Sequence, residues 1–148
     1  MKSLFITLLM LLNLNATMIR DNTLEIVIDT TTGLMWDDDY INVERKAETW
    51  KVSMNFCENL TIGAYSNWRL PNINELVNIA DYTTSSPAIN GVFLYPELEI
   101  GSYWSSTTSS ASSNPDYKNA WIIDFNTSQT SQGANKLTSY RYRCVRNF

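Results

Sequence analysis

The sequence predicts an α+β fold, in which two helices pack on antiparallel strands. The first observation is the order of the patterns: a hairpin, two helical segments and then several strands, without the strict alternation of a parallel sheet. The second is composition, since 148 residues with 44% hydrophobic and 18% charged residues suffice for one core. The third is the pair Cys57 and Cys144, which lie in the first helical segment and the last strand segment.

The first sixteen residues are typical of a signal peptide. Lys2 supplies a positive charge, residues 4–12 form an apolar run too short to span a bilayer, and Ala16 offers a small residue for cleavage. The alternative for this segment is a buried N-terminal strand. After removal of residues 1–16, we expect residues 17–148 to form a single domain without a transmembrane span. That domain would be secreted, periplasmic or exposed on the cell surface.

The two cysteines predict one disulfide. In an exported chain two cysteines are more often bridged than free, because the compartment is oxidising. A bridge from Cys57 to Cys144 would join the first helix to the last strand and close most of the domain into one loop. The alternative is two separately buried thiols.

A hairpin and a helix are predicted in the first half of the chain. The β-branched residues 24–28 and the returning residues 34–36 flank a turn-rich segment. Asn42 is a suitable N-cap for a helix over residues 43–60, where apolar side chains recur at spacings of three and four. The helix would point Cys57 into the core.

A second, capped helix is predicted after Pro71. Proline disfavours helical backbone at the residue before it, so Trp68, Arg69 and Leu70 are expected to be extended. Asn72 is a good N-cap, and Glu75 stands three residues later, at the spacing of a capping box. The helix would cover residues 73–80.

We interpret Arg69 and the tryptophans as structural. Arg69 is expected to form a pair inside the fold. Aromatic side chains dominate burial, so the tryptophans are expected in or near the core; they are Trp36, Trp50, Trp68, Trp104 and Trp121. The alternative for one of them is stacking on a sugar ring.

Strands and polar loops are predicted in the second half. Residues 102–105 and 120–125 have strand character, whereas residues 105–114 are almost all Ser and Thr and predict a loop. Residues 126–133 predict a polar hairpin or a longer loop. Residues 140–146 alternate in character, which predicts a last strand with Tyr and Cys on one face and Arg on the other.

An ordered series of short motifs covers residues 30–146. Its members are Thr32-Gly33-Leu34-Met35-Trp36, Cys57, Trp68-Arg69-Leu70-Pro71, Glu75-Leu76, Tyr103-Trp104-Ser105-Ser106, Ala120-Trp121, Asp124-Phe125 and Arg143-Cys144-Val145-Arg146. This succession resembles the Legionella collagen-like protein C-terminal domain family. The resemblance implies a C-type-lectin-like fold and an exported, adhesin-like bacterial protein.

Two departures limit what the resemblance implies. The family's best-known member is an adhesin for sulfated glycosaminoglycans, carried as a trimer on a collagen-like stalk. This chain has no Gly-X-Y repeat, and its formal net charge is -4. We therefore do not expect this chain to form a stalked trimer or to bind a strongly anionic sugar.

The residue types argue against an enzyme and against nucleic acid. The chain has no His, and with both cysteines bridged it has no thiolate nucleophile. The acidic balance lacks the basic footprint that phosphate binding needs. We expect no catalytic residue and no cofactor. The metal candidates are Asp37, Asp38 and Asp39, whose oxygens suit Ca²⁺, and the alternative for them is a solvated turn.

The ligand candidates lie in the second half of the chain. Lys136 and Arg141 could hold an acidic sugar or peptide, or they could instead pair with the acidic excess. Arg143 is interpreted as structural. Asp116, Tyr117 and Asn119 follow the Ser/Thr run, in the region where lectin-like folds carry recognition. We therefore predict a domain that binds a glycan or an envelope or host-surface protein. The alternative is a structural or protein-interaction module of the bacterial envelope.

Overall fold

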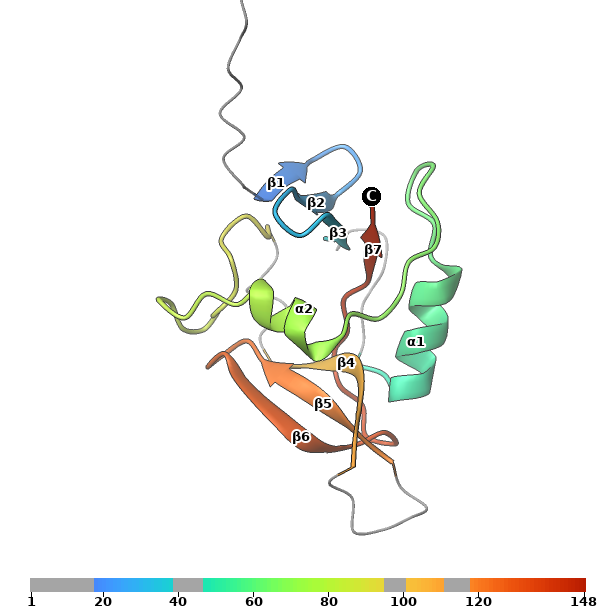
Figure 1. Cartoon of the computed structure of the whole chain (residues 1–148), viewed down its shortest axis with the longest axis vertical. Coiled ribbons are helices and arrows are strands. Elements are labelled where there is room, and N and C mark those ends of the chain that lie inside the picture. Colours follow the sequence, from blue (N-terminus) through green and yellow to red (C-terminus); the bar gives the residue numbers. More distant parts are fainter. Residues whose placement is uncertain (1–17, 39–46, 95–100, 111–117) are drawn as a thin grey trace, which may run out of the picture.

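The computed structural model describes residues 18–38, 47–94, 101–110 and 118–148. These residues form two antiparallel sheets and two helices, so the predicted α+β class is confirmed. Figure 1 shows one sheet at each end of the molecule, with α2 between them and α1 at the side. The elements are β1 (Met18–Asp21), β2 (Ile26–Asp29), β3 (Leu34–Asp37), α1 (Trp50–Asn59), α2 (Ile73–Asn78), β4 (Ser102–Ser109), β5 (Asn119–Asp124), β6 (Gln129–Asn135) and β7 (Val145–Asn147).

The first sheet joins the two ends of the described chain in the order β1-β2-β3-β7. The predicted hairpin is its centre, and Gly33 turns it with a φ of 70°, which glycine adopts at little cost. The carboxylate of Asp29 accepts hydrogen bonds from the Thr31 and Thr32 backbone N–H groups, which fixes the turn. Strand β1 was not among the sequence predictions.

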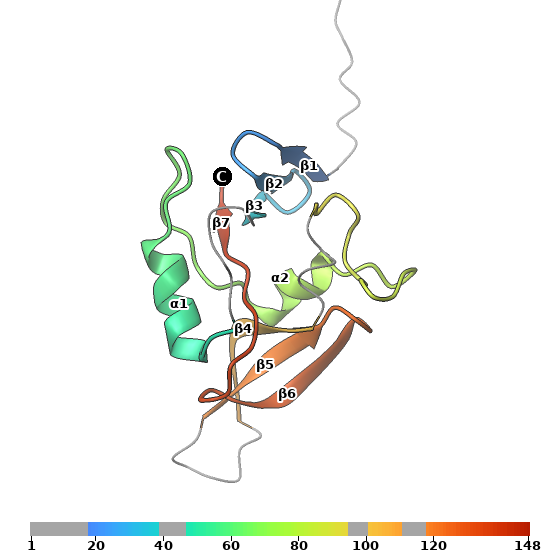
Figure 2. The ribbon, with the colours of Figure 1, turned by 180° about the vertical axis from the view of Figure 1, so that it is seen from behind.

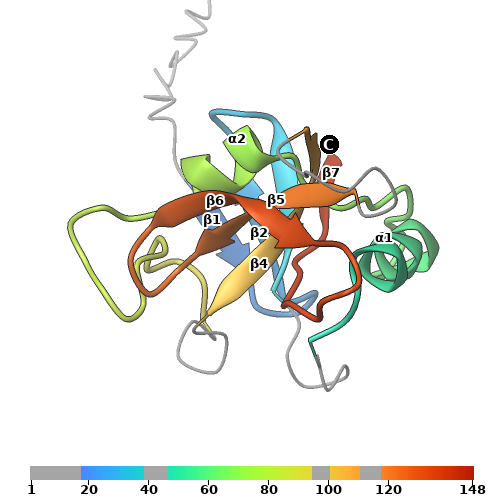
Figure 3. The same cartoon turned by 90° about the horizontal axis from the view of Figure 1, so that it is seen from below.

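The second sheet has the order β4-β5-β6 (Figure 3). Here the predicted loop over residues 105–114 is wrong in its first half, because β4 continues to Ser109. Thr108 pairs with Ala120 and Ser109 with Asn119. Backbone pairing with β5 therefore decides the structure of this run, although its side chains are polar. Of the polar hairpin or longer loop predicted over residues 126–133, the structure contains the hairpin, because a short turn leads into β6, which pairs with β5.

Helix α1 begins later than predicted. Residues 47–49 are not helical, and Thr49 is the N-cap. The reason is that Glu48 and Tyr140 exchange both backbone hydrogen bonds, at 2.9 and 3.1 Å, which commits Glu48 to extended backbone. The predicted N-cap Asn42 lies outside the described residues. Cys57 is fully buried, as expected from its place on the apolar face.

Helix α2 begins as predicted, with a complete capping box. The Asn72 side chain accepts from the Glu75 backbone N–H at 2.9 Å, and Glu75 accepts from the Asn72 backbone N–H at 2.7 Å. The helix ends before residue 80, because Ala80 leaves it to bridge with Ile89.

The β4-β5-β6 sheet is buried on both faces. Trp104 pairs with Ile122, and both belong to the core cluster that contains Cys57. Tyr103 pairs with Ile123, and both belong to the cluster that contains Trp36 and the buried side of α2. Paired residues share a face, so one cluster covers each face of the sheet.

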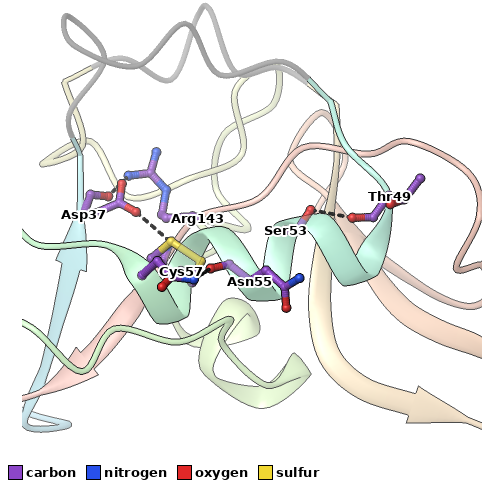
Figure 4. The surroundings of a disulfide bond; sticks show 8 residues. Asp37, Thr49, Ser53, Asn55, Cys57 and Arg143 are labelled. Carbon is purple, nitrogen blue, oxygen red and sulfur yellow. Dashed lines mark hydrogen bonds between the residues drawn. A yellow bond between two sulfur atoms is a disulfide. The ribbon is translucent and has the colours of Figure 1, made fainter.

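The disulfide between Cys57 and Cys144 is present, with Cα atoms 5.4 Å apart (Figure 4). It joins α1 to the residue that precedes β7, as predicted apart from the bounds of the strand. The predicted continuous strand over residues 140–146 is wrong: Tyr140 and Arg141 form single bridges, and β7 begins at Val145. This segment crosses from one sheet to the other, so no single neighbour can pair with its whole length.

Candidate functional site

The acidic run after β3 is part of the protein interior. Asp37 and Asp38 are 0% and 3% exposed, so they do not form the solvated turn considered above. Arg143 Nη1 donates to the Asp37 carbonyl oxygen at 2.6 Å and to Asp38 Oδ1 at 2.9 Å. The Cys144 backbone N–H donates to Asp37 Oδ2 at 2.8 Å (Figure 4). Buried carboxylates need such partners, and these contacts brace the C-terminal segment.

These contacts do not fit a calcium site. Asp38 Oδ2 also accepts from the Leu94 backbone N–H and from Arg20. A cation at Asp38 would therefore meet two guanidinium groups, those of Arg20 and Arg143. In the part of the chain that the structure describes, no group of three or more His, Cys, Asp or Glu could hold a metal ion. Asp39 lies outside that part.

Arg69 and Glu75 form the expected structural pair. The guanidinium donates twice to the carboxylate, at 2.8 and 2.7 Å. Burial raises the pKa of Glu75, but the hydrogen bonds from Arg69 and Asn72 and the charge of Arg69 outweigh it and lower that pKa. The hydrogen bond from Arg69 to Glu75 raises the pKa of Arg69. The pair therefore anchors α2, and the guanidinium and the carboxylate already have each other as partners within the fold.

The structure separates the two basic ligand candidates. Lys136 Nζ donates to Thr108 Oγ1 at 2.8 Å, near the C-terminal end of β4. The Arg141 backbone instead bonds to Ser102 and Trp104, near the N-terminal end of the same strand. Six strand residues span roughly 20 Å, so Lys136 and Arg141 do not share one site. Asp116 and Tyr117 lie outside the described residues.

Lys136 lies in a basic and aromatic setting. Its ammonium group sits over the Trp50 ring, 3.5 Å from the centroid. Burial lowers the pKa of Lys136, and repulsion from Lys118 lowers it further. Within the described residues no carboxylate forms an ion pair with Lys136. Two cations thus lie close together beside a hydroxyl and an indole ring.

Asn119 lies at the same end of the sheet. It pairs with Ser109 on one side and with Asn135 on the other. These three residues form a polar row across the sheet, on the face opposite Ala120. We use the term "Lys136 end" for this part of the sheet, made up of Thr108, Ser109, Lys118, Asn119, Asn135 and Lys136.

Trp121 was interpreted, with the other tryptophans, as a structural residue in or near the core. It is partly exposed and is not among the side chains of either core cluster described above. Residues 120–125 are apolar almost throughout, so their pattern does not tell which face each side chain occupies. The pairing of β5 with its bulged neighbours supplies that information.

An open hollow of about 520 Å³ lies along the outer side of α1. Its lining contains no charged residue and consists of Val52, Asn55, Phe56, Asn59, Leu60 and Thr61. None of the ligand candidates predicted from the sequence contributes to it.

The disulfide from α1, the two helices and the two antiparallel sheets define a small, disulfide-braced α+β domain. The chain belongs to the Lcl C-terminal domain family, whose model matches residues 25–146. This is a family of C-terminal domains of collagen-like surface proteins and not a known enzyme family. No curated protein matches the chain. Among the residues described, no helix is both long and apolar enough to cross a membrane.

Proposed function

We propose that this chain is a non-catalytic carbohydrate-binding domain of an exported bacterial protein. Membership of the Lcl C-terminal domain family supports a surface role. The apolar run near the N-terminus supports export, and a disulfide is the bond expected of an oxidising compartment. Partners are glycans or surface proteins of the envelope or of a host.

The observation that carries the proposal is the arrangement at the Lys136 end. Lys136 and Lys118 repel each other, and an acidic group of a ligand would offset that repulsion. The Thr108 hydroxyl, which contacts Lys136 on the same face, offers a donor and an acceptor of the kind that sugar hydroxyls use. A saccharide with at least one acidic substituent therefore fits this end of the sheet.

A glycan array with the disulfide-bonded protein tests this proposal, run once with Ca²⁺ and once with a chelator. We expect binding to acidic glycans in both runs, since the buried acidic run does not fit the ion. Lys136→Gln should weaken that binding about tenfold or more, because a hydrogen bond to a charged group is lost.

Arg146→Gln is the matched control for Lys136→Gln. Arg146 lies in β7 of the other sheet, over the Tyr65 ring, and its replacement removes the same charge. The affinity of Arg146→Gln for acidic glycans should equal that of the unmodified protein. Binding to no glycan in either run would refute the proposal. It would favour the alternative, a structural or protein-interaction module of the bacterial envelope. Equal losses from both variants would move the site away from the Lys136 end.

A further inference from the structure

We propose that Trp121 is a stacking platform for an uncharged sugar ring, with Asn119 and Asn135 beside it. The inference deepens the proposed function and rests on it, because it adds a neutral subsite to a carbohydrate-binding domain. It concerns the opposite face of the sheet from Lys136 and Trp50.

Strand pairing places these side chains on one face. Asn119, Trp121 and Ile123 alternate along β5, so they point to the same side. Asn135 pairs directly with Asn119 and therefore shares that side. Lys136 contacts Thr108, which pairs with Ala120, so that cluster belongs to the other side. The indole thus neighbours a row of amides and hydroxyls.

Among the described residues, Trp121 differs from the other tryptophans in how its ring is held. The indole N–H groups of Trp50, Trp68 and Trp104 donate to backbone oxygens at 2.8 to 3.0 Å. Trp36 is 0% exposed in the core. Within the described residues, the Trp121 ring has no hydrogen bond, no ring contact and no cation over it. Such a ring, if only structural, contributes little to stability for its size.

Both neighbours of Trp121 bulge at its position. Between the pairs Trp104–Ile122 and Thr108–Ala120, β4 places three residues opposite Trp121. Between the pairs Ala120–Ala134 and Ile122–Ser131, β6 places two, Gln132 and Gly133. Bulges re-aim a side chain and are frequent beside functional sites. The regular pairing of β5 with β4 and with β6 is therefore interrupted at Trp121 on both sides.

The bulges are held in place and leave room beside the ring. Ser105 Oγ donates to the Trp121 carbonyl oxygen at 2.8 Å, which satisfies this backbone group where the ladder is interrupted. A Cβ added at Gly133, one of the two β6 residues opposite Trp121, would meet no other heavy atom within 4 Å, so Gly133 borders open space. A flat ligand can therefore approach the ring.

The chemistry of the surrounding positions selects the ligand class. An indole offers an apolar face to the C–H groups of a pyranose ring and an N–H donor at its edge. The amides of Asn119 and Asn135 can donate and accept, as sugar hydroxyls do. The residues paired with Asn119 on this face are Ser109 and Asn135, neither of them charged. An uncharged hexose or N-acetylhexosamine unit fits these properties.

The test follows the indole N–H signals in ¹⁵N NMR during titration with neutral trisaccharides: maltotriose, cellotriose and chitotriose. We expect at least one sugar to bind and to shift the Trp121 signal, while the signals of the bonded indoles Trp68 and Trp104 stay in place. Trp121→Ala should weaken binding at least tenfold, and Trp121→Phe should retain most of it, because a ring remains.

Variant stability separates binding from folding. Since Trp121 belongs to neither core cluster, Trp121→Ala should keep a melting temperature within a few degrees of the unmodified protein. Binding of a neutral sugar without a Trp121 shift would refute this inference and leave the proposed function intact. Failure of all three neutral sugars to bind would also refute it, whereas the acidic glycans of the array decide the proposed function independently.

Discussion

Asp38 Oδ1 lies 2.9 Å from Arg143 Nη1, and neither side chain is more than 1% exposed. The guanidinium of Arg143 also lies 4.5 Å from the Phe93 ring centroid. This pair fixes the segment before β7 against the end of β3. Removing one member of such a pair leaves a charge buried without compensation, which is far more costly than losing a surface pair.

Arg143→Met is therefore expected to lower the free energy of unfolding by about 3–5 kcal/mol. Arg20 also contacts Asp38, which places the loss toward the lower end of that range. Urea denaturation measures it. The double variant with Asp38→Asn should recover part of the loss, because no buried carboxylate is then left. An unchanged midpoint for Arg143→Met would contradict the structural role given to this arginine.

Loss of the disulfide should destabilise the domain strongly. The bridge spans 87 residues in sequence, for which the chain-entropy model gives ~4–5 kcal/mol at room temperature. We expect the double variant Cys57→Ser with Cys144→Ser to melt at a lower temperature under oxidising conditions. Under reducing conditions the unmodified protein should approach the variant. If the unmodified protein and the double variant melted at the same temperature under both oxidising and reducing conditions, the bridge would add no stability.

Asn72→Ala should cost about 1 kcal/mol, because the Glu75 backbone N–H loses its acceptor. Denaturant titration measures the change. Asn74→Ala is the matched control, since Asn74 is exposed on the same helix and does not cap it. A loss as large in the control as in Asn72→Ala would show that the effect is not one of capping.

The Glu75 carboxylate should make the domain sensitive to acid. Its pKa is lowered in the folded protein, so its stabilising contribution is complete above the unfolded value of about 4.3 and is lost as the pH falls through the folded pKa. Glu75→Gln should therefore be less stable than the unmodified protein at pH 7, and the difference should shrink toward pH 2.

Melting temperatures between pH 7 and pH 2 measure this dependence. Glu58→Gln is the control, because Glu58 is exposed on α1. The control should follow the unmodified protein across the range. A gap between Glu75→Gln and the unmodified protein that stays constant with pH would contradict the role of the ionised carboxylate.

Local patterns predicted the elements that local chemistry determines. Asn72, Glu75 and the proline before them act within one turn of chain, and the structure contains the capping box that they indicate. The turn at Gly33 is likewise set by its own residues. The start of α1 is different, because Glu48 is held by Tyr140, a residue 92 positions later. A contact at that distance leaves no trace in helical periodicity.

The candidate site shows the same division. Charge pointed to Lys136, and a position after the Ser/Thr run, where lectin-like folds carry recognition, pointed to Asn119. The role of Trp121 depends on bulges in β4 and β6, which are properties of pairing between strands and not of either strand alone. The interior position of Arg143 has the same origin, because alternation alone placed it on the same face as Arg141, which is only partly buried.

The pairing of β3 with β7 brings Met18 and Phe148 to the same end of the molecule (Figures 1 and 2). The β4 and β5 residues that flank positions 111–117 lie at the opposite end. A biosensor surface, a bead or a fluorescent fusion can therefore be attached through either terminus without covering Lys136, Asn119 or Trp121. Attachment through a terminus therefore leaves both proposed sites accessible in the glycan array.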